Sequence, residues 1–360
     1  GGNAVTFLKG VAGLSGHEAV VRLARIAGVD LPAEGPPDPA QEAAARERAD
    51  LLHVQAVAQE VFAANLKGAG GEHARQYLTL RGISTATADA FGLGFGGLRH
   101  GDLVAEIQKR NASVRHAVDV GLVSMRHDGG GEPYDRFRGR LVCPIYNLDG
   151  AVIGFSGRLM PPVEDGPKYL NSPESRVFLK GDCVYGLYQA RRAIRQAGQA
   201  ILVEGNFDVL SLAAAGIDHA VAPLGTALTS AQLRLLKRFT DQVVVMFDGD
   251  EAGQKASRRA VALLIEAGLE GRIVPLPPHE DPDSFVHAHG VEALRHEISL
   301  ARPMIGWFVQ SLITQHGTTP HGLRQVLEEA KSTFALEHDP FRFGLYREER
   351  IAALLAALAT

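Results

Sequence analysis

The pattern of apolar and polar positions near the start of this 360-residue chain predicts a helix followed by a linker. Apolar residues recur at helical spacing over 13–31. Ser15 and Glu18 have the spacing of a capping box, and Gly28 is placed to end the helix. From Pro32 to Glu42, four prolines and a glycine disfavour both helix and sheet, so we expect a linker there.

The next segments predict helices first and then short strands. Periodic apolar positions predict a long helix over about 42–66 and a second over 72–80, which Gly82 ends. From Arg138 to Tyr188 the pattern changes to short strands and turns, with one turn at 149–150.

Beyond Ala200 short apolar runs alternate with helical patterns. Such alternation predicts a parallel sheet with right-handed crossovers. The expected strands are ILVEG (201–205), HAVAPL (219–224), QVVVMFD (242–248) and GRIVPLP (271–277), and the expected helices are 207–216, 230–239 and 252–268. The remainder, 291–360, is expected to be helical.

Composition describes an ordinary globular protein, with 46% hydrophobic and 22% charged residues. The formal net charge of -4 gives no general preference for nucleic acid, so any basic surface must be local. Residues 134–195 carry ten Lys and Arg against six Asp and Glu, which makes that segment the candidate. Two cysteines, Cys143 and Cys183, are too few for a Cys-rich zinc site or a disulfide framework, and no apolar run reaches the roughly 18 residues of a membrane span.

Acidic residues follow three of the predicted strands. Because the carboxyl ends of parallel strands meet at one edge of a sheet, we expect these carboxylates to lie together. Crowded carboxylates repel one another unless a cation neutralises them, and oxygen ligands suit Mg²⁺ or Mn²⁺. The alternative for Asp-Gly-Asp alone is a turn with a helix N-cap. The residues are Glu204, Asp208, Asp248, Asp250, Asp281 and Asp283.

These carboxylates stand in motifs that resemble a known family. VEGNFDV (203–209), DGDEAG (248–253) and DPD (281–283) resemble the TOPRIM signature of topoisomerases, small nucleases and bacterial DnaG-type primases. Four further segments resemble the primase RNA-polymerase core, and the similarity covers roughly 40–290. They are YLTLRGIS (77–84), YDRFRGRLVCPI (134–145), VIGFSGR (152–158) and PKYLNSPES (167–175).

The resemblance implies an α/β fold, α+β overall. It predicts a remnant of a zinc-binding module with a linker in 1–39, without the zinc ligands, and a basic N-terminal subdomain in 40–195. A TOPRIM parallel-sheet catalytic subdomain is expected in 196–290, followed by a C-terminal helical subdomain in 291–360.

The activity that the resemblance implies is synthesis of short RNA primers on single-stranded DNA, by metal-dependent nucleotidyl transfer with two or more Mg²⁺ or Mn²⁺ ions. Glu204, Asp248 and Asp250 would be catalytic and would hold metal together with Asp208, Asp281 and Asp283, although Glu204 could instead act as a general base. Arg138, Arg158, Lys168 and Asn171 would bind nucleotide or phosphate, and Arg136, Arg140 and Tyr169 would bind the template.

The expected partners are single-stranded DNA, ribonucleoside triphosphates, the replicative helicase through a domain that this sequence lacks, and a single-stranded-DNA-binding protein. No membrane is expected, and the location would be the cytoplasm at the replication fork. The alternative activity is that of a metal-dependent TOPRIM nuclease, which needs no triphosphate pocket.

Overall fold

The computed structural model describes residues 3–5, 16–29, 38–125, 132–161, 163, 166–225 and 227–358. The chain divides into two compact units, 1–47 and 48–360. The first unit contains helix α2 (Gly16–Ala27) and the first turns of α3 (Pro39–Lys67). Helix α2 confirms the first predicted helix, and Gly28, at φ +63°, follows it. The predicted cap Ser15 and residues 32–37 of the predicted linker lie outside the described residues.

The predicted linker is wrong over its last residues, because α3 begins at Pro39 and not at Glu42. Proline is tolerated in the first turn of a helix, where its missing N–H has no partner to lose. Asp38 Oδ1 accepts a hydrogen bond from the Ala40 N–H at 3.0 Å and so caps this helix start.

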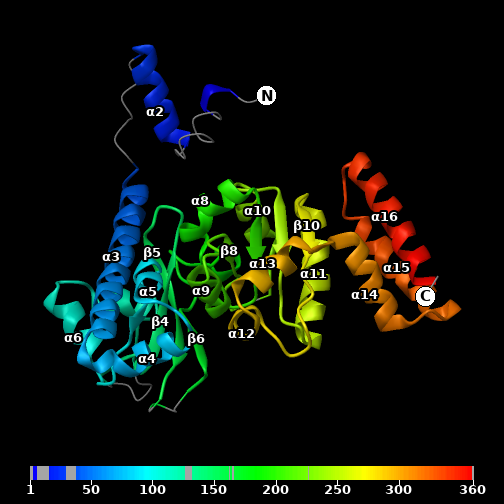
Figure 1. The fold of residues 1–360 in the computed structure, drawn as a ribbon. Coiled ribbons are helices and arrows are strands. Elements are labelled where there is room, and N and C mark those ends of the chain that lie inside the picture. The colour runs from blue at the N-terminus through cyan, green and yellow to red at the C-terminus, as the bar shows by residue number, and fades with distance from the viewer. Residues whose placement is uncertain are drawn as a thin grey trace. The chain divides into compact units, whose positions relative to one another are not determined.

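The N-terminal part of the second unit is built on a four-stranded antiparallel sheet of order β1-β4-β5-β6 (Figure 1). Phe62 of α3 and Phe155 of β5 pack edge to face with ring centroids 5.2 Å apart. The predicted helix 72–80 and the turn before Gly150 are confirmed. The elements are η1 (Ala69–Gly71), α4 (Glu72–Leu80), α5 (Thr85–Ala90), β1 (Gly94–Phe95), α6 (Asp102–Lys109), α7 (Val114–Asp119), β2 (Val123–Met125), β3 (Pro133–Asp135), β4 (Arg140–Tyr146), β5 (Val152–Leu159), β6 (Tyr169–Asn171), η2 (Lys180–Asp182) and α8 (Leu187–Ala197).

The second sheet has the order β11-β10-β9-β7-β8, in which β10, β9, β7 and β8 are parallel, as predicted. Alternate residues of its strands join two different cores. Ile201 and Val244 pack with residues of α9 and α12, whereas Leu202 and Val243 pack with residues of α8, α11 and α14. The sheet is therefore covered on both faces. The elements are β7 (Ala200–Leu202), α9 (Asn206–Ala214), β8 (Ala220–Val221), α10 (Ser230–Leu236), β9 (Gln242–Val245), α11 (Glu251–Ala267), β10 (Glu270–Ile273) and α12 (Pro282–His289).

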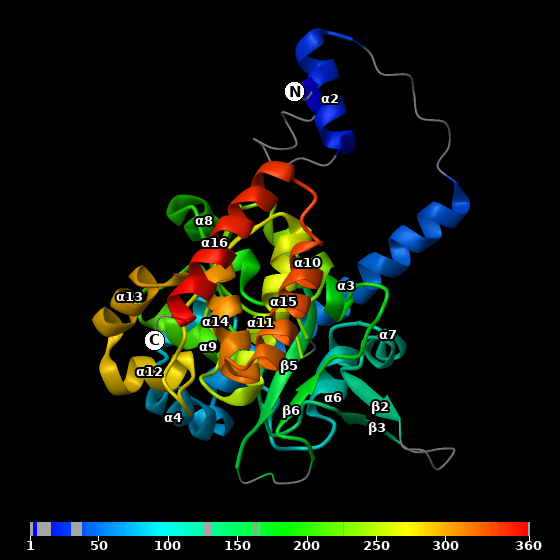
Figure 2. The ribbon, with the colours of Figure 1, turned by 90° about the vertical axis from the view of Figure 1, so that its right-hand side faces the viewer.

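The C-terminal part is helical as predicted, with one exception. A two-residue strand, β11 (Arg302–Pro303), pairs antiparallel with β10 at the edge of the sheet. The helices are α13 (Val291–Ser299), α14 (Met304–His316), α15 (Pro320–Phe334) and α16 (Pro340–Leu358). Helix α14 packs against α11, α15 and α16 (Figures 1 and 2). Among the described residues no helix combines the length and apolar character needed to cross a bilayer.

Candidate active site

Two of the predicted carboxylates meet at the carboxyl edge of the parallel sheet. Strands β7 and β9 are in register with Leu202 opposite Val245, and the Met246 N–H donates to the Leu202 carbonyl at 2.9 Å. Glu204 and Asp248 follow these strand ends, and Glu204 Oε1 accepts a hydrogen bond from the Asp248 N–H at 3.0 Å. The strand pairing therefore fixes the separation of the two carboxyl groups.

Three further carboxylates stand at helix starts on the same edge. Asp208 is in the first turn of α9, is 8% exposed, and accepts from the Gly205 N–H at 2.8 Å. Asp250 caps α11 by accepting from the Gly253 N–H at 2.7 Å, which is the cap geometry expected as the alternative for this motif. Asp281 caps α12 through the Ser284 N–H at 2.6 Å. Capping orients these side chains and leaves carboxylate oxygens for other partners.

A cavity of about 400 Å³ brings most of the predicted site residues together. Acidic residues at the carboxyl edge of the parallel sheet line it, together with basic and polar residues in or next to β5 and β6. The predicted residues that line it are Arg158, Lys168, Tyr169, Asn171, Glu204, Asp208, Asp248 and Asp281. Acidic and basic groups thus face a common space, as the binding of an anionic substrate next to a cation would require.

Five predicted residues do not line this cavity: Arg136, Arg138, Arg140, Asp250 and Asp283. Arg140 is 4% exposed, and its Nη1 donates to the carbonyl oxygens of Gly157 at 3.2 Å and Pro167 at 2.9 Å. Arg136 Nη1 donates to the Gly121 carbonyl at 3.1 Å. Both guanidinium groups donate hydrogen bonds to backbone carbonyl oxygens of this chain. Their geometry therefore gives no support to the prediction that they bind template.

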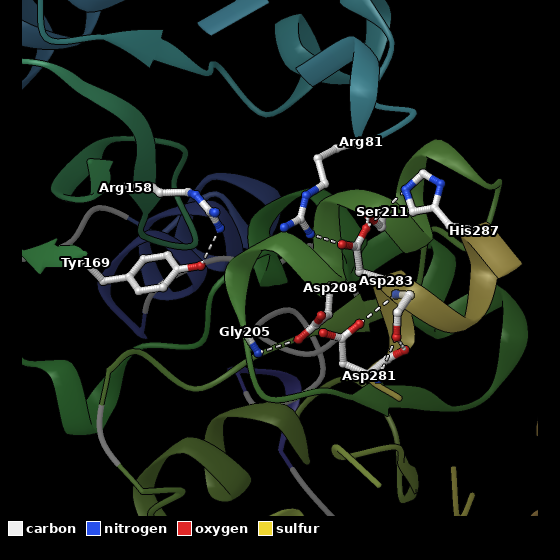
Figure 3. A network of polar contacts seen from close by, with 10 residues as sticks. Arg81, Arg158, Tyr169, Gly205, Asp208, Ser211, Asp281, Asp283 and His287 are labelled. Carbon is white, nitrogen blue, oxygen red and sulfur yellow. Dashed lines mark hydrogen bonds and ion pairs between the residues drawn. The ribbon is translucent and has the colours of Figure 1, made fainter. Parts of the chain in front are cut away.

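Asp283 has protein partners in place of a free coordination site. Its carboxylate forms an ion pair with Arg81, which follows α4, and accepts a hydrogen bond from the Ser211 hydroxyl of α9 (Figure 3). His287 Nε2 lies 3.4 Å from Asp283 Oδ1. Because the Asp283 side chain is only 5% exposed, these contacts are what keep the carboxylate compatible with burial.

Arg158 is surrounded by aromatic rings from three separate elements. Its guanidinium carbon lies 4.7 Å from the ring centroid of Tyr77, 5.4 Å from Phe207 and 5.6 Å from Tyr169. Its Nη1 also donates to the Tyr169 hydroxyl at 2.8 Å (Figure 3). Rings on several sides fix the direction of a guanidinium while leaving its charge unneutralised. The Asn171 Oδ1 nearby is buried without a hydrogen-bond partner among the described residues.

Sequence reasoning missed Arg81 and Tyr77 as site residues. Arg81 lines the cavity, and Tyr77 contacts both Arg158 and Arg81. Both belong to the segment 77–84, which supported the family resemblance without a role being assigned to it. Their i, i+4 spacing on one helix face was the available signal.

Burial and the charges of neighbouring carboxylates raise the pKa of Glu204, Asp208 and Asp248 at the sheet edge. Burial, followed by the charges of Glu204, Asp281 and Asp250, raises the pKa of Asp248 to about 7. Burial and then Asp250 raise the pKa of Glu204. Burial, Asp248 and Asp281 raise that of Asp208 well above its usual range. A positive charge placed between these groups would relieve the repulsion.

The donor set fits a hard divalent cation. Asp248 Oδ1 is buried and has no hydrogen-bond partner among the described residues. A bound cation would give this oxygen a partner. In the described part of the chain, no three His, Cys, Asp or Glu side chains are arranged as a complete metal site. The carboxylates are suitable ligands by chemistry and placement, and their roles stay predictions.

Without divalent cations, the folded chain should lose stability as the pH rises. Asp248 binds its proton more tightly in the folded protein, at a pKa of about 7, than in the unfolded chain, where the value is near 3.8. The resulting stabilisation is complete below about pH 4 and is lost as pH rises through about 7.

Thermal unfolding in EDTA from pH 5.5 to 8.5 would measure this loss. Mn²⁺ should restore the melting temperature most at the alkaline end, since the bound cation replaces the proton. A melting temperature that is constant over this range in EDTA would contradict the prediction.

Known proteins share both the sequence and the fold. A family model described as the DNA primase catalytic core, N-terminal domain, matches residues 61–191, and a Toprim-like model matches 201–286. The DNA primase of Halalkalibacterium halodurans is 38% identical over 299 residues, which cover 83% of this chain and 49% of that protein. The chain spans about half the length of the curated relatives it matches.

Solved structures extend the comparison to the arrangement of the elements. A DNA primase domain from Pseudomonas aeruginosa is 35% identical with a TM-score of 0.77, over 84% of this chain and 95% of that one. A DnaG primase catalytic domain bound to single-stranded DNA is 32% identical with a TM-score of 0.75, over 85% of this chain and 99% of that one. The two family models, the shared fold and the sequence identity together show that this chain belongs to the DnaG-type primase family, of which it contains the catalytic core.

Proposed function

We propose that this chain synthesises short RNA on a single-stranded DNA template. The observation that carries the proposal is that Arg158 and Lys168 line the same cavity as the four carboxylates Glu204, Asp208, Asp248 and Asp281. Acidic groups alone would serve many metal-dependent reactions. The facing cations add a place for the triphosphate of an incoming nucleotide, which a nuclease does not need.

In the proposed reaction the 3′ hydroxyl of one ribonucleotide attacks the α-phosphorus of the next. The new O3′–P bond forms as the bond to the leaving pyrophosphate breaks, and the hydroxyl proton leaves to a base, for which Glu204 is the candidate. Arg158, held by its three rings, and Lys168 would bind the phosphates and share their negative charge.

Asp248, Asp208 and Asp281 would hold Mg²⁺ or Mn²⁺ in this proposal, and Glu204 would be a further ligand in the alternative in which it is not the base. Asp250 is close enough to raise the pKa of both Glu204 and Asp248. When bound, such ions lower the pKa of an attacking hydroxyl and neutralise the leaving group. Asp283 is a less suitable ligand than the other carboxylates, because Arg81 already neutralises it.

The template and the cellular setting are part of the proposal. A primase core of the same fold has been solved with single-stranded DNA, which supports that template here. Ribonucleoside triphosphates would be the substrates, and the enzyme would act in the cytoplasm at the replication fork. Contacts with the replicative helicase and with a single-stranded-DNA-binding protein stay predictions.

One experiment separates the proposed polymerase from a nuclease. The chain is incubated with 5′-labelled single-stranded DNA, unlabelled ribonucleotides and Mg²⁺ or Mn²⁺, and a parallel reaction carries the label in the ribonucleotides. With either metal ion we expect labelled RNA to form and the labelled template to stay intact. Shortened template without RNA would move the assignment to a nuclease.

A further inference from the structure

Asp248 belongs to a second cavity as well as to the one that faces Arg158. This second cavity has a volume of about 200 Å³ and is lined by residues of α11, α14 and the segment after β10. Apart from Asp248, it shares no lining residue with the first cavity. In the sheet order, the first cavity adjoins the β7 and β8 side of β9, and the second adjoins the β10 and β11 side.

The second cavity continues into an open groove. The groove, with a volume of about 700 Å³, lies among α11, α14 and α15. Gln254, Ser311 and Thr314 line both spaces, so the cavity beside Asp248 and the groove adjoin along these three polar side chains. Helices α11 and α14 pack against each other and both pack against β10.

The α11 wall of the groove carries three cations, Lys255, Arg258 and Arg259. In the described part of the chain none of them has an ion pair or a hydrogen bond from its side chain. Glu251 and Glu329 also line the groove, and Glu329 accepts from His316 Nε2 at 2.8 Å. From Lys255 to Arg259 the helix rises by about 6 Å, a length comparable with two successive phosphates of one strand at roughly 3.4 Å each.

We propose that this groove, called here the α11 groove and lined by Lys255, Arg258 and Arg259, holds the phosphate backbone of the nascent RNA–DNA duplex. The inference rests on the function proposed above. Incoming nucleotides are placed by Arg158 and Lys168 on one side of the acidic residues, so a growing product must leave on another side. The α11 groove carries three cations, adjoins the cavity that contains Asp248, and shares no lining residue with the nucleotide cavity.

The groove suits a backbone better than a free nucleotide. The one aromatic residue that lines it, Phe308, is only 4% exposed and so offers no ring face on which a base could stack. Cations in a row on an exposed helix face neutralise phosphates without reading sequence. The product of any template would therefore fit.

The direct test is binding of a preformed RNA–DNA hybrid to the full chain in the absence of nucleotides. The test variant is K255Q/R258Q/R259Q. The matched control is R192Q/R234Q/R238Q, which removes three cations that have no ion pair in the described residues and line none of the three spaces. We expect the test variant alone to lose about two units of the slope of log affinity against log salt, and about 10-fold in affinity at moderate salt.

Trp307 offers a second readout, because it is the only tryptophan of the chain and lines the cavity beside Asp248. Hybrid binding should change its fluorescence in the wild type and in the control. Equal affinity and equal salt slope for the wild type and the test variant would overturn the inference. An equal loss for single-stranded DNA of the same length would also overturn it, since the groove would then follow the template strand.

RNA synthesis separates this inference from the proposed function. If the function is right, the test variant should form the first dinucleotide at the wild-type rate and make at least 5-fold less of the longer products. If the wild type makes no RNA, the proposed function fails, whereas the hybrid-binding comparison still decides whether the α11 groove binds a duplex. Dinucleotide and longer products reduced equally would contradict a role for the groove in holding product.

Discussion

Replacing Asp248 by Asn is expected to abolish RNA synthesis and at the same time to stabilise the metal-free protein at pH 8. The variant keeps the backbone N–H that Glu204 accepts from, so the strand ends should stay in place. It removes a group whose pKa is raised to about 7 by burial and then by the neighbouring carboxylates. The gain in unfolding free energy should be on the order of 2 kcal/mol, and the loss of rate at least about 1000-fold.

Both halves of this prediction are measurable on one preparation. Thermal or urea unfolding in EDTA at pH 8 gives the stability, and incorporation of labelled ribonucleotides with Mn²⁺ gives the activity. The stability difference should shrink as the pH falls and vanish only below about pH 4, where Asp248 is protonated in both the folded and the unfolded wild type. A variant that is inactive because it is unfolded, or one that keeps wild-type activity, would each contradict this role of Asp248.

Replacing Arg81 by Met is expected to cost about 3 kcal/mol of stability, more than replacing Asp283 by Asn. Removing Arg81 leaves the buried Asp283 carboxylate, 5% exposed, with only Ser211 and His287. Removing the Asp283 charge leaves Arg81, which is 31% exposed and can reach water. An uncompensated buried charge is the costlier of the two.

Urea unfolding of the two single variants and of R81M/D283N gives the coupling between these residues. The double variant should be more stable than R81M alone, because the buried charge is gone. Additive losses would show that the ion pair contributes nothing specific. Mn²⁺ binding separates the alternatives for Asp283. The affinity of the protein for Mn²⁺ should be unchanged in D283N if Asp283 only pairs with Arg81, and it should be reduced if Asp283 holds metal.

The fold of the sheet could be predicted from sequence because short apolar runs alternate with helical patterns along 200–277. Strands β7 to β10 and helices α9 to α11 lie where the pattern of 200–277 predicts them. The pattern does not reveal β11, since two residues pairing at a sheet edge leave no periodic signal. The start of α3 was missed because Pro39 was counted as a linker residue although proline suits the first turn.

The acidic half of the site was predictable and the basic half only in part. Carboxylates after parallel strands must share an edge, whatever the side-chain packing. Whether an arginine faces a cavity depends on its tertiary contacts. Arg140 and Arg158 lie on the paired strands β4 and β5, yet their side chains have different surroundings. Arg140 is buried on backbone carbonyls, and Arg158 faces the cavity between aromatic rings. The pairing of Arg81 with Asp283 joins residues 202 positions apart and could not be read from local sequence.

The most direct test of the central claim is dinucleotide formation from labelled ribonucleotides on single-stranded DNA, compared between this chain and its Glu204→Gln variant, with Mn²⁺ and with EDTA. The proposed site predicts that the wild type forms dinucleotide with Mn²⁺ and not with EDTA, and that the variant forms none above background in either condition. Product formed in EDTA, or formed equally by the variant, would contradict the claim that the carboxylates of this sheet edge catalyse nucleotidyl transfer.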